Sequence, residues 1–355
     1  MRRFLASLTI LSLIPSLTAC SGGQPSEKQT TVASTAASTA QQEETYKPVK
    51  IRAAYHPGLS GSITPGIDSI EGNQFFEKYG LEVEWVKFTS GPPEVAAMIS
   101  NDIQFGYIGH GAHTLAAEGN IDIISLTHVG NSERIFVQKD SGLEKLEDLK
   151  GKTIATQLGT SGEVILDLAL KSVGMSKDDV KVVNMDMAGA VAAFIAGQTD
   201  AIACWDSHAA NVIDKLGAEN LTLLAETSQF TDLTAFPGSW VATPQYIEKN
   251  KDVVIRFLLA LNDVYQYRYT NYDDAIKAAA EFNDQTYEEF NKARNNFIAY
   301  NPEQMNQMLD DGSLLDIYQL QLNYLIENKK VEGGDVKDYV RVDLMKEAIE
   351  KRLSQ

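Results

Sequence analysis

Three short loops rich in glycine, serine and threonine hold the groups best suited to binding chemistry in this sequence of 355 residues. The loops read Ser60-Gly61-Ser62, Gly109-His110-Gly111 and Gly159-Thr160-Ser161-Gly162. The second and third lead directly into a predicted helix, whose first N–H groups lack helical partners and carry about half a positive charge. Glycine lets an anion approach the backbone, and the hydroxyl groups add donors. The loops therefore predict an anion site that needs no lysine or arginine, with ordinary turns and helix caps as the alternative.

Aromatic and acidic side chains near these loops can complete such a site. Trp205 and Asp206 end a predicted strand, where the indole can form a wall and the carboxylate can bind an ammonium group. A half-buried tryptophan and a helix-capping aspartate are the alternative. Trp240 lies where the chain is expected to cross between two halves of the molecule and can close the same pocket. Glu163 begins the helix after the third loop, so it can meet a cationic group or simply suit a first helical turn.

The sequence offers no motif for a metal, a cofactor or catalysis. His110 and His113 are spaced to share a helix face, but no carboxylate is placed to complete a metal site. We therefore expect no metal and interpret His110 as a donor to the ligand. Cys20 and Cys204 are the only cysteines, which excludes a disulfide scaffold and a zinc or iron–sulfur cluster. No nucleophile elbow, P-loop or dinucleotide fingerprint occurs, so a binding protein without a cofactor is expected.

Short strand-like runs alternate with helical patterns along most of the chain, as in α/β proteins. The predicted strands cover residues 49–55, 81–88, 103–108, 152–156, 180–184 and 201–205. The predicted helices cover residues 67–79, 92–100, 163–172 and 188–196, together with a helix that ends at 118. After Pro244 the pattern is almost wholly helical. Alternating units of this kind predict mostly parallel sheets covered by helices.

The chain is expected to form two lobes. A stretch near residues 134–139 joins the first α/β block to the second, and a stretch near 230–240 returns the chain to the first. Lobe 1 is then residues 48–133 plus 236–355, and lobe 2 is residues 134–235. Ligands of open parallel sheets bind beyond the carboxyl ends of the strands, which is where the three loops lie. The candidate binding residues are thus expected to meet in one cleft.

The first twenty residues have the layout of a secretory signal. Two arginines precede a mostly apolar run at residues 4–17, which is too short to span about 30 Å of hydrocarbon. The tetrapeptide Leu17-Thr18-Ala19-Cys20 resembles the bacterial lipobox, in which the cysteine is lipidated. That resemblance implies that residues 1–19 are a cleaved signal peptide and that Cys20 carries the lipid. A transmembrane helix or an ordinary cleaved signal is the alternative.

Residues 20–47 are expected to form a disordered tether. They consist mainly of small and polar residues and cannot bury enough apolar surface to fold. As a flexible coil the segment has a root-mean-square reach of about 30 Å. A folded body behind such a tether can sample partners close to the membrane.

The charge of the chain limits its partners. The net charge is −17, and it becomes −19 without the two arginines of the predicted signal. An acidic surface argues against nucleic acid and against docking on anionic lipid, so contact with the membrane is expected only through the anchor. An anionic ligand would have to be held by local dipoles inside a closed cleft.

Several blocks of the sequence resemble the substrate-binding proteins of ABC importers, and more narrowly their taurine, alkanesulfonate and nitrate branch. Residues 146–155, followed by 158–161, are similar to the block "DLKGKxIAvpxGS/T". Residues 199–206 are similar to a block in which members often show "DAxxxWDP", although Ser207 replaces the proline here. Residues 101–109 are similar to the block "GDIDxGxxG". The resemblance extends over about residues 49–240 and is weak in the helical tail.

The resemblance implies an α/β, two-lobed periplasmic-binding-protein-like fold with a ligand cleft between the lobes. It also implies a monomer, anchored outside the cell membrane, that captures a small oxyanion such as taurine or another alkanesulfonate and delivers it to an ABC permease. The same scaffold also binds nitrate, thiamine or riboflavin precursors and aromatic acids, and these stay open. A pyrimidine synthase-like enzyme and a surface adhesin are further alternatives.

Overall fold

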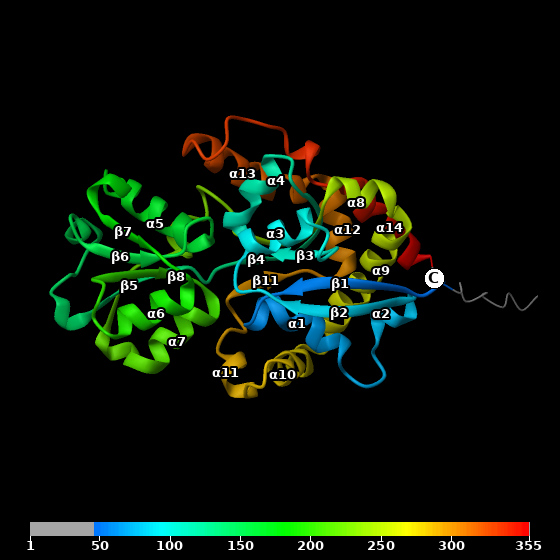
Figure 1. The fold of residues 1–355 in the computed structure, drawn as a ribbon, viewed down its shortest axis with the longest axis horizontal. Coiled ribbons are helices and arrows are strands. Elements are labelled where there is room, and N and C mark those ends of the chain that lie inside the picture. The colour runs from blue at the N-terminus through cyan, green and yellow to red at the C-terminus, as the bar shows by residue number, and fades with distance from the viewer. Residues whose placement is uncertain (1–45, 355) are drawn as a thin grey trace, which may run out of the picture. The chain divides into compact units, whose positions relative to one another are not determined.

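The computed structural model describes residues 46–354, so the predicted signal peptide, Cys20 and nearly all of the predicted tether lie outside the described residues. Within this range the chain forms the predicted two α/β lobes (Figure 1). One lobe holds a five-stranded sheet built between Arg134 and Glu226, and the other is built from the chain on both sides of that segment. We keep the names lobe 2 and lobe 1 for them, while their boundaries at 133/134 and 235/236 stay a prediction.

Lobe 2 is a single sheet with helices on both faces. The strand order is β7-β6-β8-β5-β9, with bounds β5 (Arg134–Gln138), β6 (Thr153–Thr156), β7 (Lys181–Asn184), β8 (Ala201–Cys204) and β9 (Leu221–Glu226). Strand β6 runs parallel to β7 and β8, whereas β5 runs antiparallel to β8 and β9. One face packs on α5 (Ser161–Ser172), and the other packs on α6 (Met187–Ile195) and α7 (Asp206–Leu216) (Figure 1).

Lobe 1 contains two sheets. Strands β1 (Val49–Tyr55) and β2 (Leu81–Lys87) pair in parallel, as expected. The second sheet has the order β11-β4-β10-β3, with bounds β3 (Gly106–Ile108), β4 (Asp122–Gly130), β10 (Pro237–Ala242) and β11 (Phe297–Ala299). All its pairs are antiparallel, so the prediction of mostly parallel sheets is wrong here. The reason is that β4 leads out of lobe 1 and β10 leads back, so these neighbours run in opposite directions.

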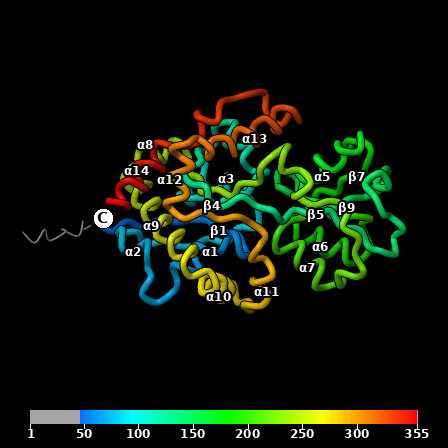
Figure 2. The backbone as a smooth tube through the Cα atoms, turned by 180° about the vertical axis from the view of Figure 1, so that it is seen from behind, coloured from blue at the N-terminus to red at the C-terminus, as the bar shows by residue number. Residues whose placement is uncertain are grey.

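Most of the remaining chain forms helices that surround the sheets of lobe 1 (Figure 2). They are α1 (Leu59–Asp68), α2 (Phe75–Lys78), α3 (Gly91–Ile99), α4 (Thr114–Ala117), α8 (Pro244–Lys249), α9 (Lys251–Thr270), α10 (Tyr272–Phe282), α11 (Tyr287–Asn291), α12 (Pro302–Asp311), α13 (Ser313–Glu327) and α14 (Val342–Leu353). The long helix α9 is at the centre of a core in which the rings of Phe105 and Phe257 stack 3.9 Å apart. The tail is therefore helical, as predicted, apart from β11.

Helix α1 differs from the prediction. The sequence pattern predicts a helix at 67–79, but the helix begins at Leu59 and only a short second helix, α2, follows. Gly61, Pro65 and Gly66 suggest a loop, yet the spacing of Leu59, Ile63 and Ile67 places all three in the core. Glycine is needed at Gly66 because a Cβ there would lie 2.6 Å from the backbone of α10. The predicted loop 60–62 is thus the first turn of a helix.

No helix in the described part of the chain is both long enough and apolar enough to cross a membrane.

Candidate functional site

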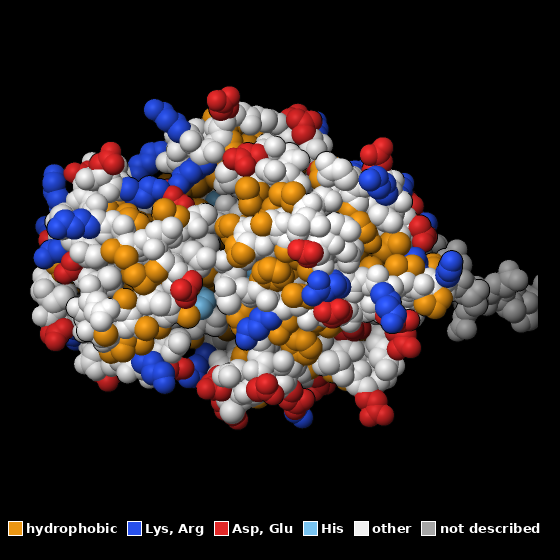
Figure 3. Space-filling view, viewed as in Figure 1, with side chains coloured by type: hydrophobic (Ala, Val, Ile, Leu, Met, Phe, Trp, Pro, Cys, Tyr) orange, Lys and Arg blue, Asp and Glu red, His pale blue; other side chains and the backbone are white. Residues whose placement is uncertain are grey.

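A cavity lies between the two lobes and takes its walls from both (Figure 3). Lobe 1 contributes the ends of β1, β3 and β4 and the turn at residues 109–112, and lobe 2 contributes residues 159–161 and 205–206. The space is about 660 Å³ when its open mouth is included. Water-sized groups can occupy about 80 Å³ of it, so the cavity suits a small molecule.

Eight of the twelve candidate residues line this cavity. They are Ser60, Gly109, His110, Gly111, Thr160, Ser161, Trp205 and Asp206. Residues that are far apart in the sequence therefore meet at the carboxyl ends of the strands, where ligands of such sheets bind. The other four, Gly61, Ser62, Glu163 and Trp240, do not line it.

Three of those four residues lie in the packing of lobe 1. Gly61 is inside α1, where a Cβ would lie 2.7 Å from the His56 carbonyl oxygen. The Ser62 hydroxyl donates to the Gly58 carbonyl and is fully buried. Trp240 is also fully buried, with its ring against those of Trp85 and Phe257. The tryptophan therefore supports the wall behind the cavity instead of closing its mouth.

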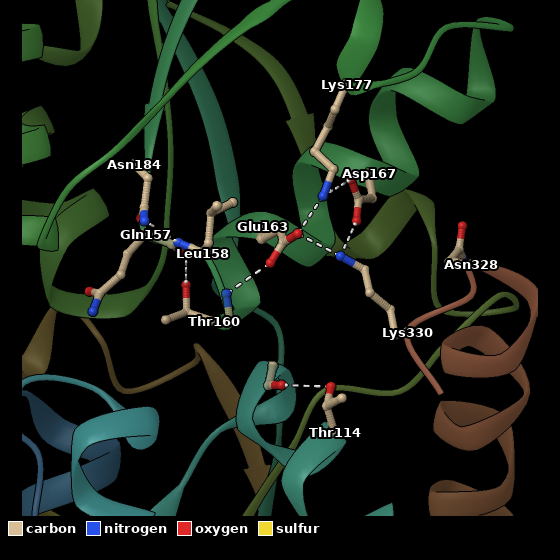
Figure 4. Close-up of polar contacts among 12 residues, drawn as sticks. Thr114, Gln157, Leu158, Thr160, Glu163, Asp167, Lys177, Asn184, Asn328 and Lys330 are labelled. Atoms are coloured by element: carbon tan, nitrogen blue, oxygen red, sulfur yellow. Dashed lines mark hydrogen bonds and ion pairs between the residues drawn. The ribbon is translucent and has the colours of Figure 1, made fainter. Parts of the chain in front are cut away.

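Glu163, the fourth, belongs to an ion-pair cluster at the edge of the cleft (Figure 4). Its carboxylate pairs with Lys177 and, at 2.5 Å, with Lys330, and both lysines also pair with Asp167. Burial raises the pKa of Glu163, but the Gly159 N–H and the two lysines outweigh it and lower the pKa to about 2. Because Lys330 follows α13 of lobe 1 and Glu163 lies in the first turn of α5 of lobe 2, the cluster links the lobes.

The N-terminus of α5 presents free donors to the cavity. Thr160 is the N-cap residue, but its hydroxyl donates to the Gln157 carbonyl at 2.6 Å and accepts from no N–H group of the helix. The N–H groups of Thr160, Ser161 and Gly162 donate to no atom of the described chain. Successive free N–H groups at the start of a twelve-residue helix are the donors that anions bind.

At the start of α1, Asp206 already accepts from Ser60. One carboxylate oxygen of Asp206 accepts from the Ser60 hydroxyl at 3.2 Å, and the other accepts from the Asn296 amide at 3.3 Å. Burial raises the pKa of Asp206, while Asn296 and the hydroxyl and N–H groups of Ser60 act to lower it. Asp206, which belongs to lobe 2, therefore lies at the N-terminus of a lobe 1 helix.

Burial keeps two histidines of the cavity wall, His110 and His128, neutral at pH 7. Burial lowers the pKa of His110 and of His128 to about 3. His110 shares a hydrogen bond of 3.0 Å with Thr234, and His113 shares one of 2.8 Å with Gln321. Within residues 46–354, no cluster of His, Cys, Asp and Glu is arranged to hold a metal ion.

Sequence reasoning missed several lining residues, including His56, Tyr107, His128 and Glu133. The first three lie at or just after the ends of β1, β3 and β4, so the strand-end rule could have found them. His56 is 2.6 Å from the fully buried carboxylate of Glu94. Burial raises the pKa of Glu94 above its ordinary value, although His56 acts to lower it. Glu133 lies in the segment that crosses to lobe 2, where no motif marks it.

Close contacts show that the cleft is closed. A Cβ on Gly111 of lobe 1 would lie 2.3 Å from the backbone of Thr160 in lobe 2. Nearby, the Gln157 amide of lobe 2 donates to the Ser90 hydroxyl of lobe 1 at 2.8 Å. The geometry suits enclosure of a small molecule between two lobes.

A family model described as "NMT1/THI5 like" matches residues 71–275, which is more than half of the chain. The chain belongs to the NMT1/THI5-like family.

Relatives of this family member support the same assignment. A protein of Brucella abortus (strain 2308), named only as a binding protein, is 30% identical over 296 residues, 83% of this chain and 91% of the relative. A protein of Bacillus subtilis (strain 168) named for binding aliphatic sulfonates is 29% identical over 304 residues, 84% of this chain and 88% of the relative. The solved aliphatic sulphonate binding protein SsuA of Escherichia coli is 21% identical, with 83% of this chain and 92% of that one covered and a TM-score of 0.61. This structural likeness confirms the periplasmic-binding-protein fold.

Gly111→Ala is expected to hold the lobes of this family member apart, because the new methyl group would meet the Thr160 backbone. Small-angle X-ray scattering should give a larger radius of gyration for this variant than for the unmodified protein. Gly109→Ala is the matched control, since a Cβ there meets nothing within 4 Å. Identical scattering from the two variants would contradict the role of the Gly111–Thr160 contact.

Lys330→Gln is expected to lower the free energy of unfolding by about 1–2 kcal/mol at pH 7, because it leaves Glu163 and Asp167 short of one cation. The pKa of Glu163 lies below its ordinary value of 4.5, so its ionised form stabilises the fold above that pH and loses this effect as the pH falls through about 2. The difference between the two proteins in denaturant melts should therefore shrink from pH 4 towards pH 2. The control is Lys329→Gln, an exposed neighbour without an ion pair in the described chain, and an equal effect from it would refute the cluster's role.

Proposed function

We propose that this chain is the substrate-binding component of an ABC importer and that it captures a small oxyanion, most simply taurine or another alkanesulfonate. The observation that carries the proposal is the pair of free N–H groups of Thr160 and Ser161 at the wall of the cavity between the closed lobes. No lysine or arginine is among the described residues that line this cavity. A sulfonate stays anionic at any ordinary pH, so neutral donors and a helix dipole are enough to bind it.

The proposed mechanism is binding without chemistry or cofactor. A ligand held by both lobes stabilises the closed form through contacts that the open form cannot make. A membrane permease then recognises the closed monomer and accepts the ligand. We also propose that the candidate residues lining the cavity contact the ligand. The foremost of them are Gly109, His110, Thr160, Ser161 and Trp205.

The proposed location is the outer face of the cell membrane, with a lipid on Cys20. The support is the layout of residues 1–20 and the tether-like composition of residues 20–47. A receptor held in this way stays within reach of its permease without entering the bilayer.

A flat aromatic amine, such as a thiamine precursor, is the second candidate ligand. The rings of Tyr107, Trp205 and Phe236 all line the cavity, and the carboxyl groups of Glu133 and Asp206 lie beside them. Such a wall can stack on an aromatic ring and accept hydrogen bonds from its amino group.

A ligand panel distinguishes these candidates. Taurine and short alkanesulfonates should stabilise the purified protein against heat, by about 2.7 kcal/mol when the ligand is at a hundred times its Kd. Thermal shift followed by titration calorimetry measures this effect, with nitrate, an aminopyrimidine and an aromatic acid as the other arms. Stabilisation by one of those arms and by no sulfonate would reject the sulfonate proposal.

Replacing Cys20 by Ala is expected to move the protein from the membrane fraction to the soluble exported fraction, because it removes the thiol that would carry the lipid. Metabolic labelling with a fatty acid should mark the unmodified protein and not this variant. Cys204→Ala is the matched control, since Cys204 is the only other cysteine and is fully buried in lobe 2. Label that persists without Cys20 would reject the anchor.

A further inference from the structure

We propose that lobe 1 carries a second ligand site, outside the cleft, that takes a small aromatic carboxylate. The site is a cavity at the end of α9 and the start of α10, beside β11, the edge strand of its sheet. Two arginines and three tyrosines line most of it, namely Arg268, Arg294, Tyr269, Tyr272 and Tyr300. None of these residues lines the cleft, so this site does not depend on the proposed function.

The charge of Arg268 is buried without a counter-ion. Arg256 and Arg268 both belong to α9, and each is only 3% exposed. Arg256 pairs with Asp252 at 3.0 Å, whereas Arg268 forms no ion pair within the described chain. Burial lowers the pKa of Arg268, and the groups that act on its charge are tyrosines, not carboxylates. Buried charges in proteins are normally paired, so this guanidinium calls for an anion.

Part of the Arg268 guanidinium is open to such an anion. Its Nη2 donates to the carbonyl oxygens of Thr127 at 3.0 Å and Tyr300 at 3.4 Å, and the group lies 4.8 Å from the centre of the Tyr265 ring. Its Nε and Nη1 donate to no atom of the described chain, and neither is sealed from solvent. Neighbouring N–H groups of a guanidinium match the two oxygens of a carboxylate.

Arg294 adds a second positive charge to the cavity. It pairs at 3.1 Å with Asp273, whose side chain is 70% exposed and does not line the cavity. An exposed pair of this kind contributes little, so the guanidinium can also serve a ligand. No acidic residue is among the described residues that line the cavity. The lining is thus positively charged, although the chain as a whole has a net charge of −17.

The tyrosine rings favour a ligand with an aromatic body. Tyr269 is 57% exposed, so its ring is available to a molecule from outside. The Tyr272 hydroxyl donates to the Arg294 carbonyl at 2.8 Å, which fixes the Tyr272 ring in the wall. Water-sized groups can occupy about 170 Å³ of the cavity. A small aromatic acid can therefore pack its ring against the tyrosines while its carboxylate meets the arginines.

Titration calorimetry with benzoate on the full chain tests the site. We expect a single benzoate to bind whether or not taurine is present, because the cavity and the cleft share no lining residue. Benzyl alcohol keeps the ring but lacks the charge, and it should bind about tenfold or more weakly. Arg268→Gln should weaken benzoate binding by about tenfold or more. The matched control is Arg52→Gln, which removes an arginine that pairs with Glu84 elsewhere on lobe 1 and should change the affinity by less than about twofold.

The results bear on this site alone. Absence of benzoate binding, binding that taurine abolishes, or equal affinities in Arg268→Gln and Arg52→Gln would each overturn the proposal, whereas the sulfonate receptor is tested by taurine itself. If Arg268→Gln does not fold, Arg294→Gln replaces it, since the Arg294 side chain is 36% exposed. That variant should weaken benzoate binding by about fivefold or more, and an unchanged affinity would overturn the proposal.

Discussion

The carboxylate of Asp206 at the N-terminus of α1 is the contact on which the closed cleft depends. Asp206 belongs to lobe 2 and is buried, and its carboxylate accepts hydrogen bonds from Ser60 and Asn296 of lobe 1. The residue also has a φ of 38°, which is uncommon for a side chain other than glycine. Strain and desolvation both oppose this arrangement, so the donors of lobe 1 must offset them. Opening the lobes would remove those donors from Asp206 and return its charge to water.

This contact makes the cleft asymmetric. Asp206 accepts from Ser60 in the first turn of α1, whereas Thr160 and Ser161 at the start of α5 keep free N–H groups for an outside anion. Glu163, which belongs to α5, faces the lysine cluster and so leaves the cavity side of that helix free of its charge. Two of the wall histidines, His110 and His128, are neutral. In a protein of net charge −17, local dipoles such as the start of α5 can still attract an anion into the cleft.

How much the sequence predicts depends on how local the interaction is. Strand alternation found β1 and β2 correctly, and the strand-end rule brought Gly109, Thr160 and Asp206 to one cavity. It could not show what Asp206 and Glu163 contact, because their partners Ser60 and Lys330 are 146 and 167 residues away. Helix α1 was missed for the opposite reason: its small residues resemble a loop, and only close packing against α10 explains Gly66.

The same geometry explains why a ligand would favour closure. Closing the lobes places the free N–H groups at the start of α5 in the wall of the cavity. Without a ligand these donors oppose the closed form, because buried N–H groups lack a partner. An oxyanion held between the lobes satisfies these donors, and it can contact lobe 1 as well only when the two lobes are together. Such differential contacts are what shift an equilibrium between open and closed forms. The unpaired groups of the cavity are therefore the source of both its selectivity and its coupling to lobe closure.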